Sequence, residues 1–366
     1  MSSNYLSGYD PISQDAVDLD SQYITDSWLV DRFVGNTVWG WGGNYRAQMP
    51  GAGGASPIQI GTANNWSRVA CGYGKAEYID NSGNASGLGY NQHNELISGA
   101  GVKQISCGYT STSFIKTDGS LYMAGTILGG NQVATRVGTL NTWSQVSCGL
   151  GTALIIKTDG TLWGCGYNGN GQLGTGNSAS NTSPVQVGSL TNWKQVSSGY
   201  SNTAAVKTDG TLWVWGTGTN GALGLGDTKN YYSPVQVGSL TNWKSVSVGY
   251  YNIAAIQTNG TLWTCGVNDQ GQLGTGDVVS YSTFVQVGTL SNWKQVSAGE
   301  GAYITKHMMA IKSDGTLWGW GANGQGRLGD GTTVSKSSPV QIGSLTNWKY
   351  VTCGYNSTLA IQNQNI

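Results

Sequence analysis

Side chains with potential for catalysis are sparse in this chain of 366 residues. It contains two histidines, His93 and His307, and neither lies in a recognisable nucleophile motif or at a position that the sequence repeats. A histidine acts as a general base only with a nucleophile and an orienting group within hydrogen-bond reach. Because the sequence shows no convergent acid, base or metal set, we expect no catalytic residues and predict that the chain is not an enzyme.

The cysteines are the next candidates, because thiolates bind metals and form disulfides. Four share one position of an internal repeat, where Ser198, Val248 and Ala298 also occur, and two replace tryptophans at another; they are Cys71, Cys107, Cys148 and Cys353, then Cys165 and Cys265. A position that accepts Cys, Ser, Val and Ala is a packing position, and no pair has zinc-knuckle spacing. We predict buried thiols and no metal site, with disulfides between neighbouring repeats as the alternative.

Glycine motifs of the kind that cradle phosphates are also present. The dinucleotide pattern G-x-G-x-x-G occurs at residues 164–169, 216–221 and 319–324. A phosphate site needs this pattern to open a helix, and none of the three does. We interpret them as turns and expect no cofactor. Asp227, Asp277 and Asp330 stand at matched places after glycine-rich loops and are interpreted as turn caps rather than calcium ligands.

The elements that carry these residues come from one unit copied seven times. Its clearest copies are residues 159–163 and 209–213, both Asp-Gly-Thr-Leu-Trp, and the third residue after the turn glycine aligns at Trp39, Ser86, Tyr122, Trp163, Trp213, Trp263 and Trp318. Each copy holds four short strand-like runs, as in residues 194–198, 204–207, 211–215 and 234–237. Repeats of about 50 residues with four strands each predict an all-β, seven-bladed β-propeller.

The two ends of the chain complete each other. The last copy stops after two strands, at residues 348–353 and 358–362, while the first begins midway, at residues 38–42 and 57–61. We therefore predict a closing blade shared between N- and C-terminal strands, which removes exposed sheet edges. The propeller is expected to span residues 33–366, and residues 1–32 are expected to form an extended leader.

A glycine-rich loop between the third and fourth strands completes the pattern. It reads NGNGQLG at residues 168–174 and is echoed at residues 268–274 and 323–329. With the Asp-Gly turns, these marks resemble the regulator of chromosome condensation repeat over residues 33–364, in the low-charge version found in bacteriophage and bacterial proteins. The resemblance implies a seven-bladed propeller. In chromatin-associated members a protruding hairpin engages a small GTPase, and no segment here is long enough to match that hairpin.

Charge is balanced overall but unevenly distributed. Residues 1–32 hold six of the 18 acidic residues and one of the 18 basic ones, so residues 33–366 carry 17 basic and 12 acidic residues. Lysines recur at matched places in the repeat, Lys116, Lys157, Lys207 and Lys312, then Lys194, Lys244, Lys294 and Lys349. We interpret them as solvated surface charges and expect no nucleic-acid partner. No apolar run approaches membrane-spanning length, so no membrane insertion is expected.

Candidate contact residues lie where the chain departs from the repeat. The leader combines its acids with aromatic residues, Tyr5, Tyr9, Tyr23 and Trp28, and can dock along a partner. Five extra residues between Gly299 and Asp314 make a candidate contact loop with Glu300, Tyr303, Lys306 and His307. Tyr231, Tyr232 and Tyr281 are expected in loops as an aromatic rim, able to contact protein or stack on sugars.

Three functions follow as hypotheses. The first is a structural component of a bacteriophage virion, present in multiple copies, with the leader anchored to a scaffold protein and the ring presented to a host-surface protein or glycan. Its location would then be the virion, or alternatively the cytoplasm. The second is a protein-binding module or inhibitor that uses one propeller face, as in the propeller that inhibits β-lactamases. The third is a small-GTPase exchange factor.

Overall fold

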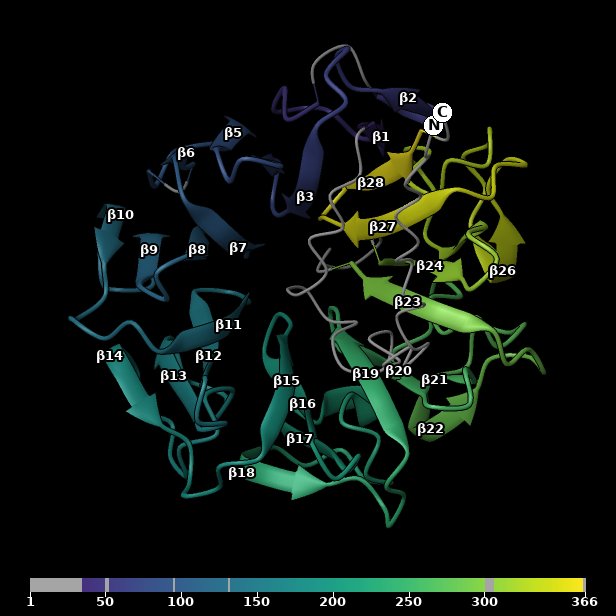
Figure 1. Ribbon diagram of the computed structural model, residues 1–366. Helices are drawn as coiled ribbons and strands as arrows, with labels where there is room; N and C mark the ends of the chain where they lie inside the picture. Colours follow the sequence, from purple (N-terminus) through teal and green to yellow (C-terminus); the bar gives the residue numbers. More distant parts are fainter. Residues whose placement is uncertain (1–34, 50–52, 95, 131, 300–305, 365–366) are drawn as a thin grey trace, which may run out of the picture.

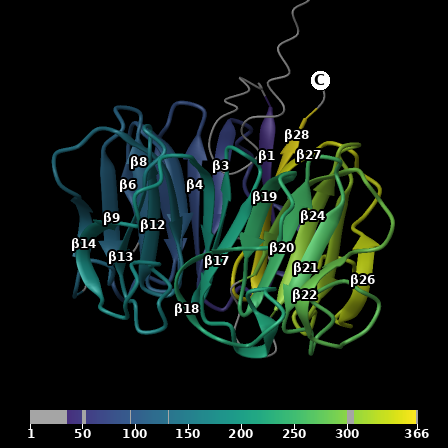
Figure 2. The ribbon, with the colours of Figure 1, turned by 90° about the horizontal axis from the view of Figure 1, so that it is seen from below.

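The computed structural model describes residues 35–49, 53–94, 96–130, 132–299 and 306–364. Within these ranges the chain forms seven four-stranded antiparallel sheets, arranged as blades around a central axis (Figure 1). Seen from the side, the strands run between the two faces of the ring (Figure 2). The predicted seven-bladed propeller is confirmed. No helix in the described ranges has the length and apolar character needed to cross a membrane.

Six blades follow one another along the chain. From the axis outward their strands are β3 (Trp66–Cys71), β4 (Lys75–Asp80), β5 (Ala85–Gly89) and β6 (Ser98–Gly99); β7 (Val102–Cys107), β8 (Ser111–Lys116), β9 (Leu121–Gly125) and β10 (Gln132–Arg136); β11 (Trp143–Cys148), β12 (Thr152–Lys157), β13 (Leu162–Gly166) and β14 (Asn181–Gln186); β15 (Trp193–Ser198), β16 (Asn202–Lys207), β17 (Leu212–Gly216) and β18 (Tyr231–Gln236); β19 (Trp243–Val248), β20 (Asn252–Gln257), β21 (Leu262–Gly266) and β22 (Tyr281–Gln286); β23 (Trp293–Ala298), β24 (His307–Lys312), β25 (Leu317–Gly321) and β26 (Lys336–Gln341). A 3-10 turn, η2 (Thr219–Gly221), lies between β17 and β18.

The seventh blade closes the ring with strands from both ends of the chain. It consists of β27 (Trp348–Cys353), β28 (Ser357–Asn363), β1 (Asn36–Gly42) and β2 (Gly54–Gln59). Strands β1 and β28 pair without interruption from Asn36 opposite Asn363 to Gly42 opposite Ser357. The shared closing blade predicted from the sequence is therefore confirmed.

The hydrophobic core lies between neighbouring blades. One cluster joins Leu154 and Leu173 of one blade to Val196 and Trp215 of the next. Each sheet thus buries both of its faces, which explains why β12, with the sequence TALIIK, reads as a continuous apolar run rather than an alternating one.

In four blades the glycine-rich loop contacts the blade that follows. The indole N–H of Trp215 donates to the carbonyl of Gln172 at 2.9 Å, and the Gly176 N–H donates to the carbonyl of Tyr232 at 2.8 Å. At Gly171, φ is +78°, and a Cβ atom would lie 2.6 Å from the Tyr232 ring. Glycine is required there both by its backbone conformation and by the close approach of the next blade.

Side chains of the innermost strands form hydrogen bonds to the backbone of the neighbouring innermost strand. The Gln195 amide donates to the carbonyl of Val246 at 2.8 Å and accepts from its N–H at 3.0 Å. Ser197 accepts from the N–H of Val248 at 3.0 Å. An innermost strand has an open edge toward the axis, and these side chains satisfy backbone groups that no further strand can reach.

Candidate binding surface: a tyrosine collar on one face

Each innermost strand is followed directly by a glycine, and these glycines meet around the axis. They are Gly72, Gly108, Gly149, Gly199, Gly249, Gly299 and Gly354. A Cβ atom on any of them would lie 2.1–3.1 Å from the carbonyl oxygen of the glycine in the next blade, and Gly354 closes the ring onto Gly72. The backbones of the seven blades therefore converge at this end of the central channel.

Directly after these glycines, five blades carry a tyrosine on the same face of the ring. We call Tyr73, Tyr109, Tyr200, Tyr250 and Tyr355 the tyrosine collar; all five are half-buried. The Tyr73 and Tyr109 rings stack with centroids 4.2 Å apart, and Tyr355 meets Tyr73 edge-on at 4.8 Å. Tyr200 and Tyr250 form a second group at 4.6 Å. Mutual ring contacts therefore hold the collar in fixed orientations before any ligand arrives.

Basic side chains flank the collar. The Arg46 guanidinium lies 4.6 Å from the ring centroid of Tyr90, which in turn contacts Tyr73 edge-on at 5.9 Å. Arg327 is buried, and its burial lowers the pKa of the guanidinium to about 10. Burial also raises the pKa of the Tyr109 hydroxyl, and a hydrogen bond with Tyr73 raises it further. The Tyr109 hydroxyl is therefore a neutral donor and acceptor at physiological pH.

The groups that this surface exposes are aromatic rings and hydroxyls. Half-buried tyrosines combine apolar ring area with a polar hydroxyl, the composition favoured at the centres of protein interfaces. In the part of the chain that the structure describes, no three or more His, Cys, Asp or Glu side chains are grouped so that they could hold a metal ion. The collar thus offers stacking surfaces and hydrogen bonds to a partner.

The predicted contact loop is corrected at two positions. His307 is the first residue of β24, it is 1% exposed, and its Nε2 lies 3.0 Å from the Thr358 hydroxyl. His307 occupies the repeat position that Asn252 occupies in the preceding blade. The His307 carbonyl accepts the N–H of Gly299, and the Asn252 carbonyl accepts the N–H of Gly249 in the same way. Lys306 is also buried and forms an ion pair with Asp269 at 3.0 Å. The sequence prediction was wrong here because the inserted residues precede the strand, and both residues belong to the buried framework.

Glu300 and Tyr303 lie outside the described residues, as do Tyr5, Tyr9, Tyr23 and Trp28 of the leader. Their assignment as contact residues stays a prediction.

The predicted aromatic rim also changes place. Tyr231 and Tyr281 begin the outer strands β18 and β22, not loops, and their hydroxyls donate to Asp227 and Asp277 at 2.9 Å and 2.8 Å. Tyr232 is 40% exposed and packs over Gly171. These three residues lie on the outer wall of the ring, because the fourth strand begins earlier than the sequence indicated.

The predicted burial of the cysteines is confirmed, whereas part of the interpretation of the lysines is wrong. All six cysteines are buried, and none forms a disulfide. The ammonium groups of Lys157, Lys207 and Lys312 are not freely solvated, because each lies 3.4–3.8 Å from the ring centroid of a tryptophan in its own blade. These lysines are part of the framework through cation–π contacts.

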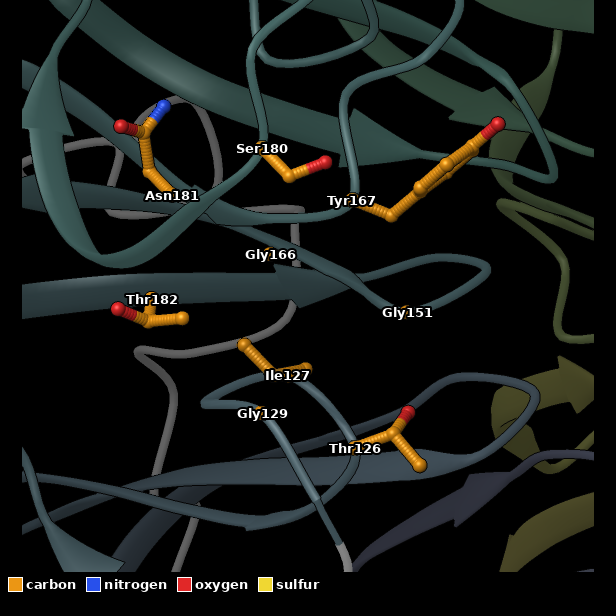
Figure 3. A pocket seen from close by; sticks show the side chains of 9 residues that line it. All are labelled: Thr126, Ile127, Gly129, Gly151, Gly166, Tyr167, Ser180, Asn181 and Thr182. Carbon is orange, nitrogen blue, oxygen red and sulfur yellow. The ribbon is translucent and has the colours of Figure 1, made fainter.

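A shallow pocket of about 250 Å³ lies between two blades on the collar face (Figure 3). Ile127 and Gly129 come from the loop after β9, and Tyr167 comes from the loop after β13. Its lining consists of hydroxyl, amide, backbone and apolar groups and includes no charged side chain.

Sequence reasoning missed the collar, although a signal for it exists. The dipeptide Gly-Tyr recurs at one repeat position in five copies, at residues 72–73, 108–109, 199–200, 249–250 and 354–355. The separation of the copies along the chain concealed that their tyrosines gather at the axis.

Comparison with proteins of known structure supports the fold. The model of the regulator of chromosome condensation (RCC1) repeat matches residues 159–206, 209–256, 259–302 and 314–361, about half of the chain, and a second model of this repeat matches residues 143–172, 193–222 and 243–272. Prp20p from Saccharomyces cerevisiae has a TM-score of 0.81 at 17% identity, covering 93% of this chain and 94% of that one. Human WBSCR16 has a TM-score of 0.78 at 19% identity, covering 91% and 99%.

Sequence relatives match over a short stretch. The ultraviolet-B receptor UVR8 of Arabidopsis thaliana is 42% identical over 62 residues, which cover 16% of this chain and 14% of that protein. Protein RCC2 of Mus musculus is 40% identical over 57 residues, covering 15% and 11%. The matched segments thus represent a small part of each relative. From the repeat matches and the closed ring, this chain belongs to the regulator of chromosome condensation repeat family.

Proposed function

We propose that this chain is a non-enzymatic protein-binding module whose contact surface is the tyrosine collar. The observation that carries the proposal is the gathering of five half-buried tyrosines at one end of the channel, held in place by their mutual ring contacts. Orientations fixed in advance lower the entropic cost of binding. A rigid aromatic centre with the exposed guanidinium of Arg46 near its edge fits a folded protein partner with an apolar, partly acidic contact patch.

The family context supports a binding role. The RCC1-type propeller is a binding and regulatory fold, and the study of Prp20p describes that protein's binding to Gsp1p and histones. This relationship is one of fold, so the partner of the present chain must be recognised by its own collar residues.

The test compares partner capture by the intact chain and by two variants. Full-length protein is immobilised, incubated with extract from its native source, and the retained proteins are quantified by mass spectrometry. In the variant Tyr73→Ser/Tyr109→Ser, we expect a specifically retained partner to bind about 30-fold more weakly, corresponding to a loss of about 2 kcal/mol. Tyr232→Ser, on the outer wall, is the matched control and should retain the partner fully.

Retention that is equal in all three proteins would contradict the proposal. Circular dichroism melting of each variant separates a lost contact from a lost fold. Footprinting of the captured complex with hydroxyl radicals should show protection at Tyr73 and Tyr355 and none at Tyr232.

A second proposal places the chain in a bacteriophage virion, anchored by the leader. It is supported by the composition of residues 1–32, which contain six aspartates and four aromatic residues ahead of a ring of low charge. Purified particles from the native source should contain the chain at a fixed copy number, and a free monomer would contradict this role. The exchange-factor hypothesis comes last, since the similarity that supports it is one of fold.

A further inference from the structure

Basic residues concentrate on the strands nearest the axis. The seven innermost strands contain six of the chain's 18 basic residues and no aspartate or glutamate; the six are Arg68, Lys103, Lys194, Lys244, Lys294 and Lys349. These strands hold about a ninth of the sequence but a third of its positive side chains. We call these six residues the lysine mouth, because they lie near the start of the innermost strands, at the opposite end of the channel from the tyrosine collar.

Each of the five lysines of the mouth lies in a β-bulge of its strand. In β15, Trp193 pairs with Lys207 and Gln195 pairs with Val206, so Lys194 is an extra residue with no partner in the ladder. The same irregularity occurs at Lys103, Lys244, Lys294 and Lys349. A bulge re-aims the side chain of the extra residue. Five equivalent bulges thus present five ammonium groups at one end of the ring.

The electrostatics of the mouth favour an anionic occupant. Burial lowers the pKa of Lys194, and the neighbouring ammonium of Lys244 lowers it further. The pKa of Lys103 is also lowered, first by burial and then by the positive charge of Arg68. The turn carboxylates on this face have charge partners outside the mouth, since the pKa of Asp159 and of Asp314 is lowered first by a hydrogen bond from the threonine two residues later and then by the ammonium of Lys157 or Lys312. Gathered like charges are stabilised when an opposite charge enters.

The acidic leader joins the ring at this same end. The N–H of Gly35, where the described chain begins, donates to the carbonyl of Asn64 at 3.1 Å, and Asn36 bridges to Asn65. Trp66, the next residue, starts β3, which carries Arg68 of the mouth. Residues 1–32 contain Asp10, Asp15, Asp18, Asp20, Asp26 and Asp31 against Arg32 alone.

We propose that the aspartates of residues 1–32 bind the lysine mouth of the same molecule. Six carboxylates and six basic groups are complementary in number and sign. The leader is long enough, since 32 residues span up to about 100 Å when extended. Its attachment beside β3 also makes the encounter intramolecular, which raises the effective concentration of the carboxylates into the millimolar range. This inference goes beyond the proposed function, whose surface lies at the other end of the channel.

Carbodiimide cross-linking of the full-length protein tests the proposal, because it joins only carboxylates and amines in direct contact. Trypsin releases residues 1–32 as one peptide, since Arg32 is the first basic residue. We expect this peptide linked to Lys194, Lys244 or Lys294 at least tenfold more often than to Lys229. Lys229 is the matched control because it is exposed and follows β17 on the collar face. In 1 M salt the mouth cross-links should fall at least fivefold.

Two variants and one mixing experiment decide the outcome. Asp10→Asn/Asp15→Asn/Asp18→Asn leaves three reactive carboxylates in the leader, and Arg68→Gln/Lys103→Gln/Lys349→Gln leaves the reporting amines of Lys194, Lys244 and Lys294. Each variant should lower the remaining cross-links at least threefold, because half of the attracting charge on one side is gone. Equal linking to Lys229, or unchanged leader cross-links in either variant, would overturn the proposal. When ¹⁴N- and ¹⁵N-labelled proteins are mixed, cross-links within one isotope support binding within one molecule, and frequent mixed pairs would overturn it.

Discussion

A methyl group placed on the Cα of Gly149 would lie 2.1 Å from the carbonyl oxygen of Gly199 in the next blade. This contact repeats around the axis, so the radius of the ring is set where backbone meets backbone. Glycine is needed at Gly149 for the space around its Cα, since its φ is not in the left-handed region.

The variant Gly149→Ala should destabilise the ring, because the new methyl group must push two blades apart. We expect a loss of about 1–3 kcal/mol in the free energy of unfolding, measured by urea denaturation. Gly324→Ala is the matched control, since its Cβ would meet nothing within 4 Å and its φ is not positive. A Gly149→Ala protein as stable as the control would show that the blades separate without cost.

Removal of a glutamine that bonds to the next innermost strand should also lower the stability of the ring. Gln195→Ala would leave the buried N–H and carbonyl of Val246 without their partner. An unsatisfied buried polar group costs about 1–3 kcal/mol, and we expect a loss in this range by urea denaturation. Ser245 occupies the equivalent position in β19, where a shorter hydroxyl side chain stands in place of the amide of Gln195. Ser245→Ala should therefore change stability by less, and equal losses would contradict the assigned role of Gln195.

The turn aspartates predict an acid-sensitive ring. Hydrogen bonds from Thr161 and Thr316 lower the pKa of Asp159 and Asp314. Because the folded pKa lies below the unfolded value of about 3.9, their stabilisation is complete above that pH and is lost as the pH falls through the folded pKa.

The aspartate prediction has a built-in control. Asn259 makes the same contacts to Thr261 without a titrating group. Asp159→Asn/Asp314→Asn should therefore lose less stability than the wild type between pH 5 and pH 3, measured by urea unfolding at each pH. Parallel losses in the two proteins would contradict the assignment.

The thiols should be inert until the ring opens. Burial raises the pKa of Cys107, Cys165, Cys265 and Cys353, so little thiolate exists at pH 8. Ellman's reagent should find no fast-reacting thiol in the native protein and six in 8 M urea. A fast native reaction would show that one blade opens independently of the others.

Much of the fold was readable because each blade is specified locally. The Asp-Gly turns, the Trp positions and the glycine-rich loops recur in register. The pairing of β1 with β28 was predictable because the partial copies at the two ends of the chain add up to one complete blade. His307 was misplaced because the insertion before β24 hides its repeat position, which is visible only through the pairing of Gly299 with His307.

By itself the sequence determined the number of blades, the shared closing blade and the buried thiols, because turn chemistry and hydrophobic pattern act over neighbouring residues. Only the tertiary structure decided which repeat positions meet at the axis. Tyr73 and Tyr355 are 282 positions apart in the sequence, yet their rings are 4.8 Å apart. Ring closure brings together residues that share a place in the repeat, and it assembles the tyrosine collar at one end of the channel and the lysine mouth at the other.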